Sequence, residues 1–247
     1  MAQLVIDIGN SFTKMAVFDE ADLLGVGSYN KIIEQDIQDL FQAYHITKAI
    51  ISTVKKEPQP WVELVEKHVK VSYFNSSMAY GITNHYATPQ TLGLDRLAAV
   101  TGALYLYPGL DNLVIDAGTC ITYDGVDAAG NYYGGSISPG LQMRFKALQY
   151  YTSALPLVNA DAGFSNYYGN DTVTAMRSGV QNGILYEVEG FIQNYNKQAQ
   201  SLNIILTGGD SEFLHTMLKN SIFAGYIKTE PQLVLEGLNA AIQEHND

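Results

Sequence analysis

The chain carries almost the same octapeptide twice. LVIDIGNS occupies residues 4–11, and LVIDAGTC occupies residues 113–120, which lie 109 positions later. In both copies an apolar run typical of a buried strand reaches an Asp, and a Gly follows two residues on. Such a repeat in a chain of 247 residues predicts two related halves. The string LVID is common in buried strands, so the alternative is that the repeat is a coincidence. A matching order of secondary-structure elements after the two copies would favour duplication.

The first half predicts three strands followed by alternating helices and strands. Three short apolar runs joined by tight polar turns are typical of an antiparallel meander, at residues 3–9, 12–18 and 23–29. Helical periodicity follows at residues 33–44 and 60–68, and buried strands are expected at residues 48–54 and 69–74.

The second half repeats this order. Three strands are expected at residues 112–118, 119–126 and 131–138, and Pro139 suits the first turn of a helix. Apolar residues at three- or four-residue steps predict a long helix over residues 172–197. A strand at residues 202–209 and helices at residues 211–219 and 231–244 complete the half. We therefore expect an α/β fold of two duplicated domains, residues 1–110 and 111–247, each ordered β-β-β-α-β-α-β.

Composition excludes several classes of function. A formal net charge of −11 makes most of the surface repel a nucleic acid or an anionic membrane, so neither is an expected partner. The single cysteine, Cys120, excludes an intrachain disulfide and a cysteine-built zinc site. No signal peptide is readable, and no segment approaches the roughly 18 apolar residues that a membrane helix needs. We expect a cytoplasmic protein.

The two Asp-Gly turns can bind a polyphosphate. A carboxylate at the end of a buried strand requires a cation or several N–H donors. Asp7 and Asp116 would meet this requirement by holding water bound to the metal ion that accompanies the polyphosphate. Gly9 and Gly118 let the backbone turn tightly and present N–H groups, and Ser11 and Thr119 add hydroxyl donors. The alternative is that both Asp side chains only cap turns.

The paired turns resemble those of the superfamily of actin, sugar kinases and heat-shock chaperones. In that superfamily, duplicated ribonuclease-H-like domains bind ATP in a cleft between two hairpin loops. The resemblance implies this fold and an ATP cleft between the two domains. A chain of 247 residues leaves little room for the inserted subdomains of actin or chaperones, which favours a small-molecule kinase.

The segment LGLDRLAA, residues 92–99, offers an acceptor site. Phosphoryl transfer to an alcohol needs a carboxylate to accept the hydroxyl proton, and Asp95 is a candidate. Arg96 can hold an anionic acceptor by two parallel hydrogen bonds. The alternative is a helix N-terminal charge beside a surface arginine, since an apolar helical run follows at once.

At this point the resemblance to type III pantothenate kinases becomes close. The shared motifs occur in one order along the whole chain: DIGNSFTK at residues 7–14, Tyr86 with Pro89, GLDR at residues 93–96, VIDAGT at residues 114–119, GGSISPGL at residues 134–141, and the spacing Thr172, Ala175, Ser178, Gly179. Ser11 stands where that family usually has Thr, which keeps the hydroxyl. The implied activity is ATP-dependent phosphorylation of pantothenate to 4′-phosphopantothenate, the first step of coenzyme A biosynthesis.

The resemblance also implies roles for individual residues. Asp95 would be the general base. The ATP-binding residues would be Asp7, Ile8, Gly9, Asn10, Ser11, Phe12, Thr13, Lys14 and Thr119. The pantothenate-binding residues would be Tyr86, Gly93, Leu94, Asp95, Arg96 and Thr172. Asp116 would hold a monovalent cation, K⁺ or NH₄⁺, in addition to the Mg²⁺ that accompanies ATP.

The resemblance also implies a homodimer, in which Thr172 contacts pantothenate across the interface between the two subunits. Gly208 and Gly209 are candidates for the adenine pocket, although a glycine pair is as often a plain turn. Three other functions remain open: a non-catalytic regulatory relative of the same fold, a kinase for another small hydroxy acid, and an actin-like scaffold. The regulatory relative would predict damaged DxG or GxDR motifs, whereas all three carboxylates are present here.

Overall fold

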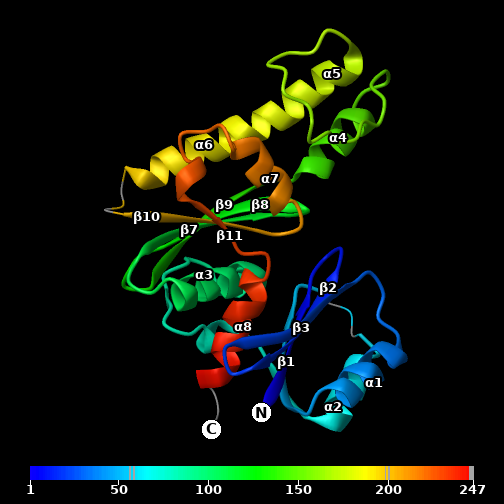
Figure 1. The fold of residues 1–247 in the computed structure, drawn as a ribbon, viewed down its shortest axis with the longest axis vertical. Helices are drawn as coiled ribbons and strands as arrows, with labels where there is room; N and C mark the ends of the chain where they lie inside the picture. The colour runs from blue at the N-terminus through cyan, green and yellow to red at the C-terminus, as the bar shows by residue number, and fades with distance from the viewer. Residues whose placement is uncertain (56, 58, 198, 200, 245–247) are drawn as a thin grey trace. The chain divides into compact units, whose positions relative to one another are not determined.

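The chain folds into two compact units, described here from a computed structural model (Figure 1). The structure describes residues 1–55, 57, 59–197, 199 and 201–244. The first unit comprises Met1–Pro108, Ala129–Tyr133 and Gln232–Asp247, and the second comprises Gly109–Ala128 and Gly134–Pro231. None of the helices within the described ranges is long and apolar enough to cross a membrane.

The first unit is built on a five-stranded sheet of order β3-β2-β1-β4-β5. Its strands are β1 (Ala2–Ile8), β2 (Thr13–Asp19), β3 (Asp22–Tyr29), β4 (Ile46–Thr53) and β5 (Lys70–Tyr73). Strands β1, β2 and β3 form the predicted antiparallel meander, and β4 and β5 add in parallel. The helices α1 (Glu34–Ala43) and α2 (Val62–His68) contribute Ile37, Trp61 and Val65 to the core with alternate residues of the central strands.

Two helices from distant parts of the sequence pack together in the same unit. α3 (Leu94–Leu106) contacts α8 (Leu233–Glu244), and α8 also contacts β1, β2 and β4. The helices approach so closely at Gly102 and Gly237 that a Cβ on either glycine would collide with backbone of the other helix. The last helix of the chain is therefore part of the first unit.

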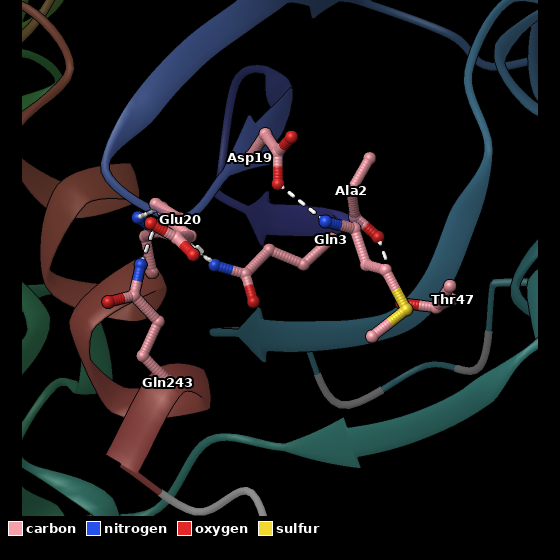
Figure 2. Close-up of polar contacts among 8 residues, drawn as sticks. Ala2, Gln3, Asp19, Glu20, Thr47 and Gln243 are labelled. Atoms are coloured by element: carbon pink, nitrogen blue, oxygen red, sulfur yellow. Dashed lines mark hydrogen bonds and ion pairs between the residues drawn. The ribbon is translucent and has the colours of Figure 1, made fainter.

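Hydrogen bonds tie α8 to the N-terminal hairpin (Figure 2). Glu20, in the turn between β2 and β3, has a left-handed φ of 53°. Its carbonyl oxygen accepts hydrogen bonds from the side-chain amides of Gln3, Asn239 and Gln243. Three donors on one carbonyl offset the cost of this backbone conformation.

The second unit contains the strands that match the first sheet. The second sheet has the order β11-β10-β7-β8-β9-β6. Its strands are β6 (Thr83–Asn84), β7 (Asp111–Ala117), β8 (Cys120–Val126), β9 (Asn131–Pro139), β10 (Leu202–Thr207) and β11 (Ile227–Thr229). The short β6 pairs with the first residues of β9, Asn131 and Tyr132, which belong with it to the first unit. Apart from β6, this order is that of the first sheet counted in the opposite direction.

The helices of the second unit follow β9 and β10. They are α4 (Leu141–Tyr150), α5 (Thr172–Arg177), a π-helical segment (Ser178–Asn182), α6 (Gly183–Asn196) and α7 (Ser211–Leu218). Short 3-10 turns complete the chain at Ser76–Met78, Pro89–Thr91 and Ala224–Tyr226. Buried residues of α4, α6 and α7, including Phe145, Ile184 and Leu214, form one core with the strands.

Most predicted elements are confirmed, and the matching sheet orders confirm the duplicated fold. The prediction for Pro139 was wrong, because Pro139 ends β9 and α4 begins after Gly140. The predicted long helix contains a π-helical turn, and its expected last residue is the end cap, Lys197. The sequence boundary at residue 110 is close to the end of the first unit at Pro108, but α8 and residues 129–133 join that unit.

Candidate active site

The first Asp-Gly turn links β1 and β2. The turn is closed by a hydrogen bond from Gly9 N–H to Phe12 O (3.0 Å), and Asn10, Ser11 and Phe12 are exposed. Asp7 alternates with Ile6 and Ile8, whose side chains belong to the core under α1 and α2, so its carboxyl group lies on the other sheet face. The turn thus offers an exposed hydroxyl and exposed backbone groups next to a partly buried carboxylate.

The second turn links β7 and β8 and is closely surrounded. Gly118 N–H donates to Cys120 O (2.9 Å), and Thr119 is exposed. Gly140 N–H donates to Thr119 O (3.1 Å) from the start of α4. On the other side Gly208, with φ of +91°, lies so close to Asp116 that a Cβ there would overlap its carboxylate. Only glycine fits that position.

Each Asp has a buried hydroxyl beside it on the neighbouring parallel strand. Asp7 pairs in register with Ser52 of β4, and Asp116 pairs with Thr207 of β10. Ser52 is 0% exposed and Thr207 is 1% exposed. We did not predict these two hydroxyls from the sequence, because strand register brings them to the turns. The only sequence signal is a Ser or Thr near the end of each buried strand.

The candidate acceptor residues lie together at the start of α3. Gly93 caps the helix, and the Asp95 carboxylate accepts a hydrogen bond from Arg96 N–H (2.8 Å). Arg96 is only 7% exposed, and its guanidinium carbon lies 5.8 Å from the ring centre of Tyr86. The Tyr86 ring is in turn stacked with Tyr132. A buried guanidinium with an aromatic neighbour suits a planar anion such as a carboxylate.

Thr172 is the first residue of α5, so it belongs to a different element from the second turn. Asp171 caps this helix by accepting a hydrogen bond from Thr174 N–H (2.9 Å). Thr172 itself is exposed. Several exposed aromatic residues lie at the end of α4, before α5 or within α6, namely Tyr150, Tyr151, Tyr167, Tyr168 and Tyr186. Thr172 and these tyrosines are therefore all exposed residues of the second unit.

One further carboxyl group adjoins the second turn. Asp210 N–H donates to Ala117 O (2.8 Å), which places the Gly208–Asp210 segment directly against Asp116 and Ala117. Burial raises the pKa of the Asp210 carboxyl group. The described residues contain no cluster of three or more acidic, histidine or cysteine side chains able to hold a metal ion.

The predicted site residues therefore form three local groups, and Thr172 lies outside them. Residues 7–14 form the first turn, Tyr86 with residues 93–96 forms the acceptor group, and both belong to the first unit. Asp116 and Thr119 form the second turn, and with Thr172 they belong to the second unit. Gly208 and Gly209 adjoin that second turn.

The fold is one that solved sugar kinase structures share. The chain is similar to a solved structure of the activator of 2-hydroxyisocaproyl-CoA dehydratase from Clostridium difficile with bound ADPNP (TM-score 0.52, 13% identity, 98% of this chain and 94% of that chain). It is also similar to a Campylobacter jejuni protein described as belonging to the Baf family of transcriptional activators (TM-score 0.61, 22% identity, 98% of each chain). At these identities the likeness concerns the fold alone.

The family follows from the sequence comparison. Residues 3–194 match the model of the type III pantothenate kinase family. A type III pantothenate kinase from Phocaeicola vulgatus is 43% identical over 245 residues, which cover 99% of this chain and 98% of the relative. The chain belongs to the type III pantothenate kinase family.

Proposed function

We propose that this chain is an ATP-dependent pantothenate kinase of coenzyme A biosynthesis, which gives 4′-phosphopantothenate. The observation that supports this most strongly is family membership over nearly the full chain, with the intact GLDR segment. The γ-phosphoryl group of ATP would move to the primary hydroxyl of pantothenate, and ADP and one proton would be released. Because its two substrates, ATP and pantothenate, are small metabolites of the cell interior, we expect the enzyme to act in the cytoplasm.

Asp95 would act as the general base in this reaction. Its carboxylate lies at the first turn of α3, where it is held by the N–H group of Arg96. Accepting the proton of the substrate hydroxyl as the oxygen attacks phosphorus would accelerate transfer by about 10² to 10⁴-fold. Arg96 would bind the pantothenate carboxylate, with the Tyr86 ring beside it fixing the orientation of the guanidinium.

The two turns would bind the phosphates of ATP. In the first turn, Asp7 to Lys14 would supply backbone N–H groups and the Ser11 hydroxyl, and in the second turn Thr119 would add its own. Preorganised donors stabilise the charge on the transferring group because they need no rearrangement during the reaction. That both turns serve one ATP remains our prediction.

The residues present fit hard cations with oxygen ligands. Mg²⁺ usually keeps waters and binds substrate phosphates with one or two carboxylates, which agrees with the absence of a larger acidic cluster among the described residues. Asp116, with the close backbone of Gly208 beside it, would hold K⁺ or NH₄⁺. The bound cations would neutralise charge that develops on the phosphates. Equal activity in K⁺, NH₄⁺ and a bulky organic cation would exclude the monovalent site.

A homodimer would use the exposed aromatic residues of the second unit and the exposed Thr172. Tyr150, Tyr151, Tyr167 and Tyr168 are each at least 78% exposed, and large exposed apolar areas on a soluble protein commonly mark interfaces. Thr172 of one subunit would then contact pantothenate bound by the other. A monomer by light scattering at micromolar concentration would reject this arrangement.

The decisive experiment incubates the purified chain with ATP, Mg²⁺ and K⁺ and a panel of hydroxy acids. We expect phosphorylation of pantothenate and little turnover of the others. Turnover of another acid without turnover of pantothenate would reject the substrate but keep the kinase. No turnover of any acid would reject the kinase and favour a regulatory relative.

A further inference from the structure

The first unit contains a cavity of about 520 Å³, and none of its lining residues except Thr13 has a role in the proposed reaction. Its walls come from the start of β2, from the segment that enters α1, from the connection between β4 and α2, and from α2 itself. Thr13, in the wall, has the strand orientation of Met15 and Val17, which face the core under α1 and α2. The cavity is therefore on the opposite sheet face from the Asp7 carboxyl group, and its size is typical of small-molecule sites.

Two lysines give the cavity a positive character. Lys31 and Lys55 both line it, and neither forms an ion pair with any residue that the structure describes. Glu34 is the one acidic side chain among the lining residues. In a protein with 25 acidic and 14 basic residues, two lysines in the wall of one cavity favour an anionic ligand.

Neutral polar groups add hydrogen-bonding capacity. Asn30 supplies amide N–H donors and Thr13 supplies a hydroxyl, while the Gln59 amide already donates one hydrogen bond to Glu57 O (3.2 Å) and keeps a second N–H. Such groups can bond the oxygens of a carboxylate or a phosphate monoester while the lysines neutralise its charge.

The rest of the lining is apolar and includes a flat surface. Trp61 and Leu64 lie on the α2 side, with Ile32 and Pro60 nearby. Trp61 is 8% exposed, so its ring is fixed in the core and only a small part can face a ligand. An indole surface favours contact with a flat or apolar group.

We propose that this cavity is a second ligand site, which binds a small anion with a flat or apolar body. The anionic head, a phosphate monoester or a carboxylate, would lie between Lys31 and Lys55. The body would lie against Trp61. The site is independent of the pantothenate kinase activity proposed above, because none of its lining residues except Thr13 belongs to the predicted catalytic groups.

The chain provides its own reporter for a test. Trp61 is the single tryptophan of the protein, so tryptophan fluorescence has one source, which lies in the wall of this cavity. Titrations without ATP or pantothenate would use phenyl phosphate, benzoate, inorganic phosphate and uncharged benzyl alcohol. We expect a saturable change with phenyl phosphate or benzoate, and the stronger of the two identifies the head group. No saturable change with either probe, or equal binding of benzyl alcohol, would overturn the proposal.

Charge variants separate a specific site from general attraction. Lys31→Gln and Lys55→Gln should each weaken binding of the better probe about tenfold, the effect of one lost charged hydrogen bond. Lys70→Gln removes the same charge from an exposed position on β5 outside the cavity and should leave binding unchanged. Equal weakening by all three variants would contradict the proposal. So would displacement of the probe by ATP, which would assign the cavity to the nucleotide.

Discussion

The guanidinium carbon of Arg96, in the first turn of α3, lies 5.8 Å from the ring centre of Tyr86. A buried arginine of this kind is fixed in orientation, and its planar fork can form two parallel bonds to a carboxylate. Arg96→Lys keeps the charge but loses the fork. We expect the KM for pantothenate to rise about 10- to 100-fold with a smaller change in kcat, as for the loss of one charged hydrogen bond.

Tyr86→Phe is the matched control, because it keeps the ring and removes only the hydroxyl. Its KM should stay within about threefold of the wild type, whereas Tyr86→Leu should weaken binding through loss of the cation–π contact, by about 1 kcal/mol. Steady-state kinetics with varied pantothenate measure both effects. An Arg96→Lys enzyme with unchanged KM would show that Arg96 does not bind the acceptor.

Asp95→Asn tests the general base. The Asn side-chain oxygen can still accept the hydrogen bond from Arg96 N–H, so the start of α3 should be preserved. The amide cannot accept the substrate proton, and kcat should fall by about 10² to 10⁴-fold while pantothenate still binds. Asp36→Asn makes the same change at α1, where Asp36 accepts a hydrogen bond from Ile33 N–H (2.8 Å), and should keep full turnover. An active Asp95→Asn enzyme would overturn the base assignment.

Gly208 and Gly209 are adjacent but differ sharply in the space around them. A Cβ at Gly208 would overlap the Asp116 carboxylate and the Ala117 carbonyl, at a φ of +91° that L-residues rarely adopt, whereas nothing lies within 4 Å of a Cβ at Gly209. Gly208→Ala should displace the second turn, destabilise the protein by about 1–3 kcal/mol and remove most activity. Gly209→Ala should be nearly neutral for stability. Thermal unfolding and kinase assays of both variants test this, and a fully active Gly208→Ala enzyme would contradict it.

The sequence predicts the local elements of this fold well because their signals are local. Alternation of apolar residues and the Asp-Gly turns identify β1, β2, β7 and β8. The sequence does not predict the short strand β11, because residues 227–229 carry too little pattern and form a strand only by pairing with β10. The position of α8 beside α3 also depends on contacts between residues more than 130 positions apart, which no local pattern contains.

The same limit applies to the candidate site. Asp95 and Arg96 are adjacent in the sequence, and the GLDR segment was enough to select them. Ser52 and Thr207 reach Asp7 and Asp116 only through strand register, so only the structure identifies them. The predicted division at residue 110 rests on the duplication of the sequence and remains a prediction. The compact units are defined instead by contacts between residues.

Gly237 tests the packing of α8 on α3. A Cβ at this position would collide with Ala98 O, so Gly237→Ala should separate the helices and destabilise the first unit by about 1–3 kcal/mol, although alanine favours a helix. At Gly190, inside α6, an added Cβ would have nothing within 4 Å, and Gly190→Ala should stabilise by about 0.5–1 kcal/mol. Denaturant unfolding measures both. Changes of the same sign would show that packing does not decide the effect at Gly237.

Glu187 gives the second unit a predictable response to acid. Its carboxylate accepts hydrogen bonds from Tyr123 Oη (2.8 Å) and Arg144 Nη2 (2.7 Å). Burial acts to raise the pKa of Glu187, but the hydrogen bonds from Arg144, Tyr123 and Ser138 and the charge of Arg144 outweigh it, so the pKa lies below the usual 4.5. A carboxyl group with a lowered folded-state pKa stabilises the fold fully above its unfolded pKa. That stabilisation is lost as the pH falls through the folded pKa.

Glu187→Gln should therefore change the pH dependence of stability in a defined direction. At pH 7 the variant should unfold about 1 kcal/mol more easily, near the lower end for a charged hydrogen bond because the Glu187 side chain is 24% exposed. Between pH 5 and about 3 the wild type should lose stability faster, so that the difference between the two proteins shrinks. Denaturant midpoints across this range measure it, and Glu189→Gln, two positions further along α6, is the control for a change of net charge. A constant difference at every pH would show that ionisation of Glu187 contributes nothing to stability.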